Sequence, residues 1–229
     1  MVDWRNAAVW QLILKLLGVK SSDGPAPSLP SLPSESKTNS KPALPEEKKV
    51  KPSKTPKALE NLVKIALSQV GVKETGGNNN GAKVRQYQAA TNLKPASWPW
   101  CAALTSWVIR EWLKDKENVE WLGLKVLTPE KWRPKTAAAF GYIQWAKSRP
   151  ATTKVLSPKA KPQVGDIVVF DFSHIGIIAK VGEKNFQCVE GNTNGRGTRD
   201  SKSGDGVWLK TRTSSLVRNY IRMNPSTAK

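Results

Sequence analysis

The chain has 229 residues, and its 37 lysines and arginines against 18 aspartates and glutamates give a formal net charge of +19. Such a charge favours a polyanionic partner: nucleic acid, anionic lipid or a bacterial wall polymer. Two cysteines, Cys101 and Cys188, are too few for a disulfide scaffold or a four-cysteine zinc site, and a single histidine, His174, excludes a histidine-rich metal centre.

The first predicted element is a mostly apolar helix with a thin polar stripe over residues 4–20. The segment is too short and too interrupted to cross a membrane comfortably. Asp3 before the apolar run, and Gln11 and Lys15 within it, also make it a poor secretory signal. We interpret residues 1–20 as a docking or oligomerisation helix, with membrane contact, contact with a phage or secretion particle and an atypical export signal as the alternatives.

Residues 21–57 have the composition of a linker. They hold eight of the sixteen prolines, together with eight serines, seven lysines and no aromatic residue. Such a segment cannot bury enough apolar surface to offset its chain entropy. We therefore expect an extended, disordered tether that leads into a folded domain over residues 58–224, followed by a short tail over 225–229.

Within the predicted domain, apolar residues at helical spacing come first, and short β-branched segments separated by glycine, asparagine and aspartate come after them. Helices are expected over residues 59–70, 82–91, 101–114 and 136–147, and strands over residues 166–170, 174–181, 185–191, 206–211 and 219–223. Helices followed by strands indicate an α+β fold in which the helices pack on an antiparallel sheet.

The stretch "WPWCAALTSW" places Cys101 at the head of the third predicted helix, where Pro99 suits the helix start. A helix N-terminus activates a thiol through its unpaired backbone N–H groups and the positive end of its dipole. The same N–H groups can hold the oxyanion of a tetrahedral intermediate. Cys101 is therefore a candidate nucleophile, although most unpaired cysteines are small buried hydrophobes.

His174 begins an apolar strand and is the only imidazole that can act as a base. On the next predicted strand, Cys188, Glu190 and Asn192 share one face by the two-residue period. If that face meets His174, Glu190 or Asn192 can accept a hydrogen bond from the second ring nitrogen and fix the tautomer. The alternative interpretation is that Glu190 and Asn192 are turn residues. Cys188 is expected to be a core residue.

Three motifs in this order resemble the CHAP family of cysteine, histidine-dependent amidohydrolases and peptidases: "WPWCAALTSWV", "VGDIVVF" followed by "FSHIGII", and "VEGNTN". The upstream segment "GVKETGGNNNGAKVRQYQ" and the closing segments "GDGVWLKTR" and "VRNYIR" are similar to the matching parts of phage and bacterial lysins of this family. The resemblance covers about residues 60–223. It implies a papain-like α+β domain that cleaves amide bonds in peptidoglycan.

The resemblance also implies roles for individual residues. Cys101 matches the nucleophile and His174 the base. Glu190 is the first choice for the residue that orients His174, and Asn192 either replaces or assists it. No cofactor is implied, and no metal is expected because no dense acidic cluster precedes Cys101.

Substrate contacts are predicted beside the nucleophile and in the asparagine-rich loop over residues 76–81. The candidate substrate-binding residues are Trp98, Trp100, Asn78 and Asn80. The two tryptophans are either groove walls or core residues, and the asparagine loop and Ser97 are candidates for the second oxyanion donor. Glu74, just before that loop, either lines the cleft or caps a helix.

The sequence thus predicts a peptidoglycan hydrolase, either an N-acetylmuramoyl-L-alanine amidase or a peptide endopeptidase. We expect a phage endolysin or particle-associated lysin that is made in the cytoplasm and acts in the periplasm or cell wall. The alternatives are an NlpC-type endopeptidase and a non-catalytic wall-binding or particle-structural component. No nucleic-acid-binding motif is present, so net charge alone does not predict a specific nucleic-acid partner.

Overall fold

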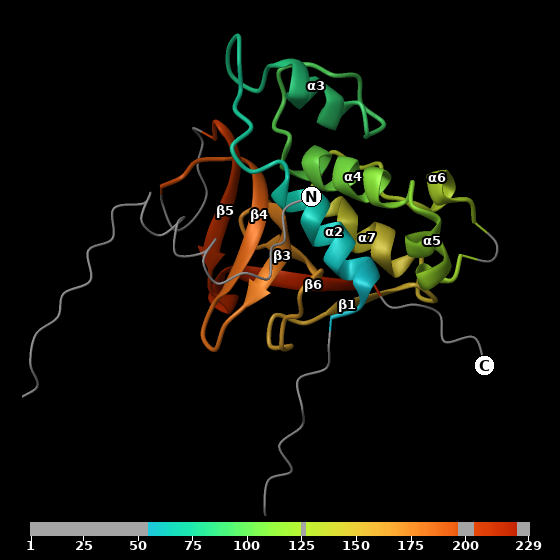
Figure 1. Ribbon diagram of the computed structural model, residues 1–229. Coiled ribbons are helices and arrows are strands. Elements are labelled where there is room, and N and C mark those ends of the chain that lie inside the picture. Colours follow the sequence, from blue (N-terminus) through green and yellow to red (C-terminus); the bar gives the residue numbers. More distant parts are fainter. Residues whose placement is uncertain (1–54, 125–126, 197–203, 224–229) are drawn as a thin grey trace, which may run out of the picture. The chain divides into compact units, whose positions relative to one another are not determined.

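The computed structural model describes residues 55–124, 127–196 and 204–223 (Figure 1). All of them belong to the compact unit formed by residues 51–229. The predicted N-terminal helix, the linker up to residue 54 and the tail over 225–229 lie outside the described residues.

Helices precede strands along the described chain, as the α+β prediction requires. The helices are α2 (Lys57–Leu67), α3 (Ala82–Gln88), α4 (Cys101–Trp112), α5 (Lys116–Leu122), α6 (Pro129–Trp132) and α7 (Gly141–Lys147). The strands are β1 (Thr153–Leu156), β2 (Ile167–Phe170), β3 (Ile175–Val181), β4 (Phe186–Thr193), β5 (Gly206–Arg212) and β6 (Val217–Met223), with a short 3₁₀ turn over Ser214–Leu216 before the last. The predicted fold class is confirmed.

The strands form one antiparallel sheet in the order β1-β6-β2-β3-β4-β5. Helices α2, α4 and α7 pack on the sheet, α4 against β3 and β4 and α7 against β1 and β6 (Figure 1). Strand β2 is buried on both faces: Ile167 and Val169 join the core beneath the helices, and Val168 and Phe170 join a second core on the other face. Burial on both faces explains its continuous apolar sequence.

Helix α4 is the central helix of the layer. Nine of its twelve residues are buried, because it contacts α2, α3, β3 and β4. Helix α2 buries only the face formed by its apolar residues at helical spacing, which are Ala58, Leu59, Leu62, Val63 and Ala66. A helix with apolar residues on all its faces, such as α4, is therefore the one that other elements surround, whereas α2 has one exposed face.

Three elements were not predicted from the sequence: α5, α6 and β1. Two of them have clear helix-start signals, since Asp115 caps α5 by accepting from Glu117 N–H at 2.9 Å, and Thr128 caps α6. The helix predicted over 136–147 begins only at Gly141. Thr136 Oγ1 accepts a hydrogen bond from Ala138 N–H at 3.1 Å, which holds the preceding segment in a turn.

The contact between β4 and α4 depends on a glycine. A Cβ atom at Gly191 would lie 2.7 Å from Cζ3 of Trp100 and 2.8 Å from Cδ2 of Leu104. Real Cβ contacts are longer, so any side chain here would push the helix away from the strand.

We expect Gly191→Ala to lower the free energy of unfolding by about 1–3 kcal/mol, the usual cost of overpacking a tightly packed core. Urea denaturation measures the difference. Gly182→Ala, at an exposed turn where the nearest atom is the side-chain oxygen of Asn185, is the matched control and should cost less. Equal losses in the two variants would contradict the tight α4–β4 contact.

Candidate active site

Cys101 is the first residue of α4, and 8% of its surface is exposed. The residue before it, Trp100, donates its backbone N–H to Asn192 Oδ1 at 3.1 Å. Within the described residues, no hydrogen bond engages the backbone N–H of Cys101. The sulfur therefore lies at the positive end of the helix, beside a donor that can bind an oxyanion.

His174 is the last residue of the turn that joins β2 to β3. Its carbonyl accepts from Phe170 N–H at 2.9 Å, and Ser173 before it has a φ of 62°, a left-handed conformation that closes the turn. The imidazole is stacked near Phe170 and Phe172, with ring centroids 6.0 and 5.8 Å away. Backbone and ring contacts together hold His174 in one orientation with 6% of its surface exposed.

The two ring nitrogens of His174 serve different partners. Nε2 lies 2.9 Å from Glu190 Oε2, which leaves Nδ1 for Cys101. Burial alone would lower the pKa of His174. The hydrogen bond and charge of Cys101, followed by those of Glu190, outweigh burial and raise that pKa to about 10. His174 is therefore a cation at neutral pH, held between two groups that favour its charge.

Glu190 is fully buried and accepts hydrogen bonds on both oxygens. Arg212 donates from Nε to Oε1 at 2.8 Å and from its second terminal nitrogen to Oε2 at 2.6 Å. Burial would raise the pKa of Glu190, but the bonds from Arg212 and His174 lower it to about 2. The site thus contains a continuous chain of polar contacts from Cys101 through His174 and Glu190 to Arg212.

Cys188 lies on the same strand face as Glu190 and donates its thiol to Glu190 Oε1 at 2.8 Å. It is fully buried, and burial together with the negative charge of Glu190 raises its pKa. The thiol form is therefore favoured. Both cysteines are free, and Cys188 is a core residue as the sequence analysis expected.

Asn192 lies on the other side of the site from the His174–Glu190 contact. The β4–β5 register shifts between Glu190 and Thr193, and Asn192 has a φ of 54°, so the two-residue alternation ends before it. Its amide contacts Trp100 N–H and Asn79 Oδ1, the latter at 2.9 Å. No hydrogen bond joins Asn192 to His174 among the described residues, and Glu190 is the residue in the orienting position.

Glu74 ties this asparagine to the start of α4. Its Oε1 accepts from the indole N–H of Trp100 at 2.8 Å and from the amide of Asn192 at 3.3 Å, and its Oε2 accepts from Asn79 N–H at 2.8 Å. Glu74 does not cap a helix. It belongs to a four-residue network that holds the backbone just before Cys101.

One of the expected substrate contacts is contradicted by the structure. Trp100 is fully buried, so the expectation that its ring forms a groove wall is wrong: the ring packs on Tyr87 and its polar edge binds Glu74. Trp98 is half-buried and Asn78 is exposed. Asn80 bonds its own loop, through Gly76 O and Gly81 N–H.

Arg212 and Asn79 are not among the site residues predicted from the sequence. A sequence signal existed for Arg212: Lys210 and Arg212 occupy alternate positions of a strand, on the same face and both buried. Cations on a buried face need a carboxylate partner, and the neighbouring strand carries Glu190. Asn79 lay in the loop that was singled out, but nothing local separates it from Asn78 and Asn80.

Within the described ranges, no group of three or more histidine, cysteine, aspartate or glutamate side chains could hold a metal ion. No helix in this part of the chain has both the length and the apolar character needed to cross a bilayer.

The fold and the site together define an α+β domain with a buried cysteine–histidine–glutamate arrangement. The family model described as the CHAP domain matches residues 93–192, a span that includes Cys101, His174, Glu190 and Asn192. Residues 93–192 are thus similar to the CHAP domain, and the resemblance drawn from the motifs is confirmed.

Comparison with curated proteins found no match. Among solved structures, one similar chain is that of "The crystal structure of Ly7917 with the hydrolyzing product of MDP". The two are 16% identical with a TM-score of 0.42, over 73% of this chain and 62% of that one. The match thus spans less than two thirds of that protein's length.

We expect the single histidine to titrate near pH 10, because Cys101 and Glu190 raise its pKa to about 10. Cys101→Ala should lower this pKa, since it removes a hydrogen bond and a charge that favour the imidazolium. NMR of the ¹³C-labelled imidazole measures both values without ambiguity, as no other histidine is present.

Cys188→Ala is the matched control, because Cys188 is not among the groups that act on the pKa of His174. In this variant the pKa of His174 should stay well above 6.5. A wild-type pKa near 6.5, or equal values in the wild type and Cys101→Ala, would contradict the Cys101–His174 contact.

Replacing Glu74 by alanine should lower the free energy of unfolding by about 1–3 kcal/mol, because the indole N–H of Trp100 loses its acceptor. Glu74→Gln should cost less, since its carbonyl can still accept one of these bonds. Glu183→Ala, at an exposed turn, is the control. If urea denaturation gave the same loss in free energy of unfolding for Glu74→Ala and Glu183→Ala, the network would be ruled out.

Proposed function

We propose that this chain is a cysteine amidohydrolase or peptidase that hydrolyses an amide bond of bacterial peptidoglycan. The observation that carries the proposal is the contact of His174 with both Cys101 and buried Glu190, within the segment that matches the CHAP domain. A nucleophile, a base and a residue that orients the base are the groups that acyl transfer needs.

In the first step the sulfur of Cys101 attacks the scissile carbonyl carbon. His174 carries the proton that it later donates, because Cys101 and Glu190 both favour the imidazolium. The oxyanion that forms is placed near the backbone N–H of Cys101 at the start of α4. His174 then gives its Nδ1 proton to the leaving amine, the C–N bond breaks, and a thioester remains on Cys101.

In the second step water hydrolyses the thioester. Neutral His174 takes a proton from the attacking water, the C–S bond breaks, and the carboxylic acid product leaves. The proton returns to the Cys101–His174 pair. Glu190 stays ionised throughout, since its pKa is about 2, and it holds Nε2 in the protonated form.

The charge of the protein supports an anionic wall as the place of action. Residues 58–229 carry 27 lysines and arginines against 13 aspartates and glutamates, so the positive excess is a property of the domain and not of a tail. The biological role that we propose is that of a lysin, either a phage endolysin or a particle-associated enzyme, which reaches the periplasm or cell wall after synthesis in the cytoplasm.

Purified peptidoglycan incubated with the full chain tests the proposal, with released fragments identified by mass spectrometry. New sugar-free peptides with an N-terminal alanine would indicate an amidase, and new ends within the stem or cross-bridge would indicate an endopeptidase. Cys101→Ala should slow release at least about 10³-fold, as loss of a nucleophile does in comparable enzymes.

Cys188→Ala is the control for loss of a thiol in general, and we expect its rate to stay within about tenfold of the wild type because that thiol is fully buried and has no part in the proposed mechanism. No release by the wild type would refute the hydrolase. Equal release by Cys101→Ala would refute the mechanism.

A further inference from the structure

A hollow of the domain lies between α6, α7 and the loop that follows α3. Its volume is about 590 Å³, within the range of small-molecule sites. Its lining residues are Asn92, Leu93, Lys131, Arg133, Lys135, Thr136, Ala137, Ala138, Gly141, Trp145 and Arg149. Cys101, His174 and Glu190 are not among them, so this cavity is separate from the candidate active site.

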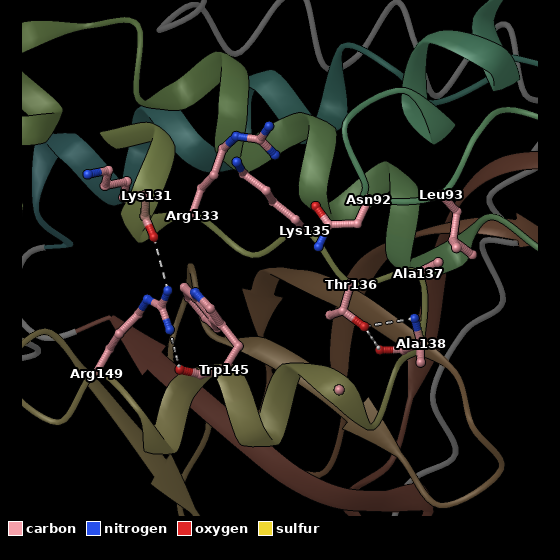
Figure 2. A pocket seen from close by; sticks show the side chains of 11 residues that line it. Asn92, Leu93, Lys131, Arg133, Lys135, Thr136, Ala137, Ala138, Trp145 and Arg149 are labelled. Atoms are coloured by element: carbon pink, nitrogen blue, oxygen red, sulfur yellow. Dashed lines mark hydrogen bonds between the residues drawn. The ribbon is translucent and has the colours of Figure 1, made fainter. Parts of the chain in front are cut away.

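Four cations line the cavity, and no carboxylate does. Figure 2 shows Lys131, Arg133 and Lys135 on one side of the hollow and Arg149 with Trp145 on the other. Cations gathered on both sides of one cavity add their fields within it, and a low-dielectric wall strengthens the effect.

Arg149 is a fixed cation whose hydrogen-bond partners are all uncharged. Its guanidinium donates to the backbone carbonyls of Trp132, Trp145 and Lys131, at 2.6, 3.2 and 3.0 Å, and to the hydroxyl of Ser148 at 2.6 Å. In the described part of the chain it has no carboxylate partner. Burial lowers its pKa, as expected for a cation without a counter-ion, and an arginine remains charged nevertheless.

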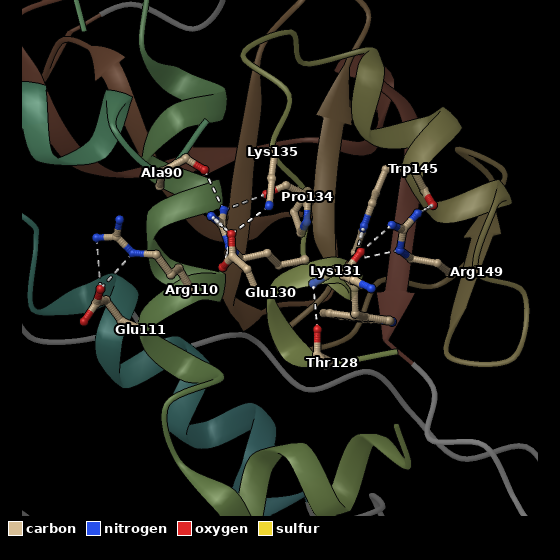
Figure 3. A network of polar contacts seen from close by, with 12 residues as sticks. Ala90, Arg110, Glu111, Thr128, Glu130, Lys131, Pro134, Lys135, Trp145 and Arg149 are labelled. Carbon is tan, nitrogen blue, oxygen red and sulfur yellow. Dashed lines mark hydrogen bonds and ion pairs between the residues drawn. The ribbon is translucent and has the colours of Figure 1, made fainter. Parts of the chain in front are cut away.

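The opposite side has one carboxylate for two cations. Glu130 binds Arg133 at 2.6 Å and Lys135 at 2.7 Å (Figure 3). Arg133 is held further by its bond to Ala90 O at 2.6 Å. Lys131 is exposed, and its ammonium has no ion-pair partner among the described residues. The four cations that line the cavity and the one carboxylate of Glu130 together have a formal net charge of +3.

This arrangement favours a ligand with several negative charges spaced along a flexible chain. The two arginine forks are already occupied by carbonyls and by Glu130, so they act as fixed charges and not as bidentate clamps. Two ammonium groups are point charges at the rim, suited to phosphate oxygens: that of Lys131, which has no ion-pair partner among the described residues, and that of Lys135, which shares Glu130 with Arg133. Fixing the arginines before binding also reduces the entropy lost on binding.

The same cavity is poorly suited to nucleic acid. Proteins that bind single strands combine cations with exposed aromatic rings on which bases stack. The one aromatic side chain here, Trp145, is 8% exposed and packs against Trp132 and Tyr142.

We propose that this cavity binds the phosphates of an anionic, phosphodiester-linked polymer of the cell wall and so holds the domain on its substrate. The choice of a wall polymer rests on the proposed function. The anion site itself rests on the cations that line the cavity.

Binding of the full chain to a synthetic poly(glycerol phosphate) oligomer, measured by titration calorimetry at several salt concentrations, tests the proposal. The variant Lys131→Gln/Lys135→Gln removes two rim charges and leaves the fixed arginines in place. Its affinity should fall at least about tenfold at low salt. The slope of log K against log salt should fall by about 1.4, at about 0.7 per lysine as found for single-stranded polyanions.

The matched control is Lys180→Gln/Lys184→Gln, which removes the same charge from exposed positions on β3 and the turn after it. This control should lose less than about threefold in affinity. An equal loss in both double variants would mean that net charge alone attracts the polymer and would overturn the site. Equal or tighter binding of a single-stranded DNA oligonucleotide of matched charge would overturn the choice of ligand.

Hydrolysis of peptidoglycan stripped of its anionic polymers separates this proposal from the proposed function. Lys131→Gln/Lys135→Gln should hydrolyse the stripped wall at the wild-type rate and the intact wall more slowly. If the wild type hydrolyses neither wall but binds the oligomer through these lysines, the proposed function fails and the anion site stands. If the variant hydrolyses both the intact and the stripped wall at the wild-type rates, the cavity does not hold the enzyme on the wall as we propose.

Discussion

Glu190 carries a negative charge in the centre of the domain, and the residues on both sides of it depend on that charge. A fully buried carboxylate is stable only when its charge is balanced and its oxygens are bonded. Arg212 supplies the balancing charge, and His174 takes the remaining position on Oε2. Removing one partner of such a pair typically costs about 3–5 kcal/mol, because the other is left buried without compensation. The same contacts hold the imidazole toward Cys101, so the stability of the domain and the geometry of the candidate site depend on one ion pair.

The position of α4 is the second requirement, because Cys101 is its first residue. Two features of β4 set that position. Gly191 lets the strand approach Trp100 and Leu104 closely, and Asn192 turns out of the strand to accept the N–H of Trp100. Glu74 then binds both Trp100 and Asn192 from a distant part of the chain. Cys101 is therefore placed by contacts of its neighbour Trp100 and not by contacts of its own side chain alone.

Two arginines of this domain show opposite uses of a buried cation. Arg212 is 2% exposed and paired with a carboxylate, so its charge is neutralised inside the protein by that of Glu190. Arg149 is held as firmly, but by carbonyls and a hydroxyl, so its positive field extends into the cavity beside α7. Net charge does not distinguish these cases, because both residues count equally in the total of +19. The hydrogen-bond partners distinguish them.

Local sequence patterns determined most of the elements and the residues on which the candidate site is centred. Helical spacing and a proline-led start placed Cys101 at a helix N-terminus, and the two-residue period placed Cys188 and Glu190 on one face of a strand. These patterns succeed because they depend on neighbours in the sequence. They also missed short elements, such as β1 and α6, whose few residues carry little periodic signal.

Only the tertiary structure decided how the site is completed. The partner of Glu190 is 22 residues away on β5, and Glu74 reaches Asn192 across 118 residues. The burial of Trp100 follows from its packing on Tyr87, and the redirection of Asn192 follows from a bulge with a positive φ. A single sequence determines which side chains are available and which face of an element they occupy. Which of them meet is decided by packing between distant segments and by local breaks in the strand alternation, and no periodic pattern contains either.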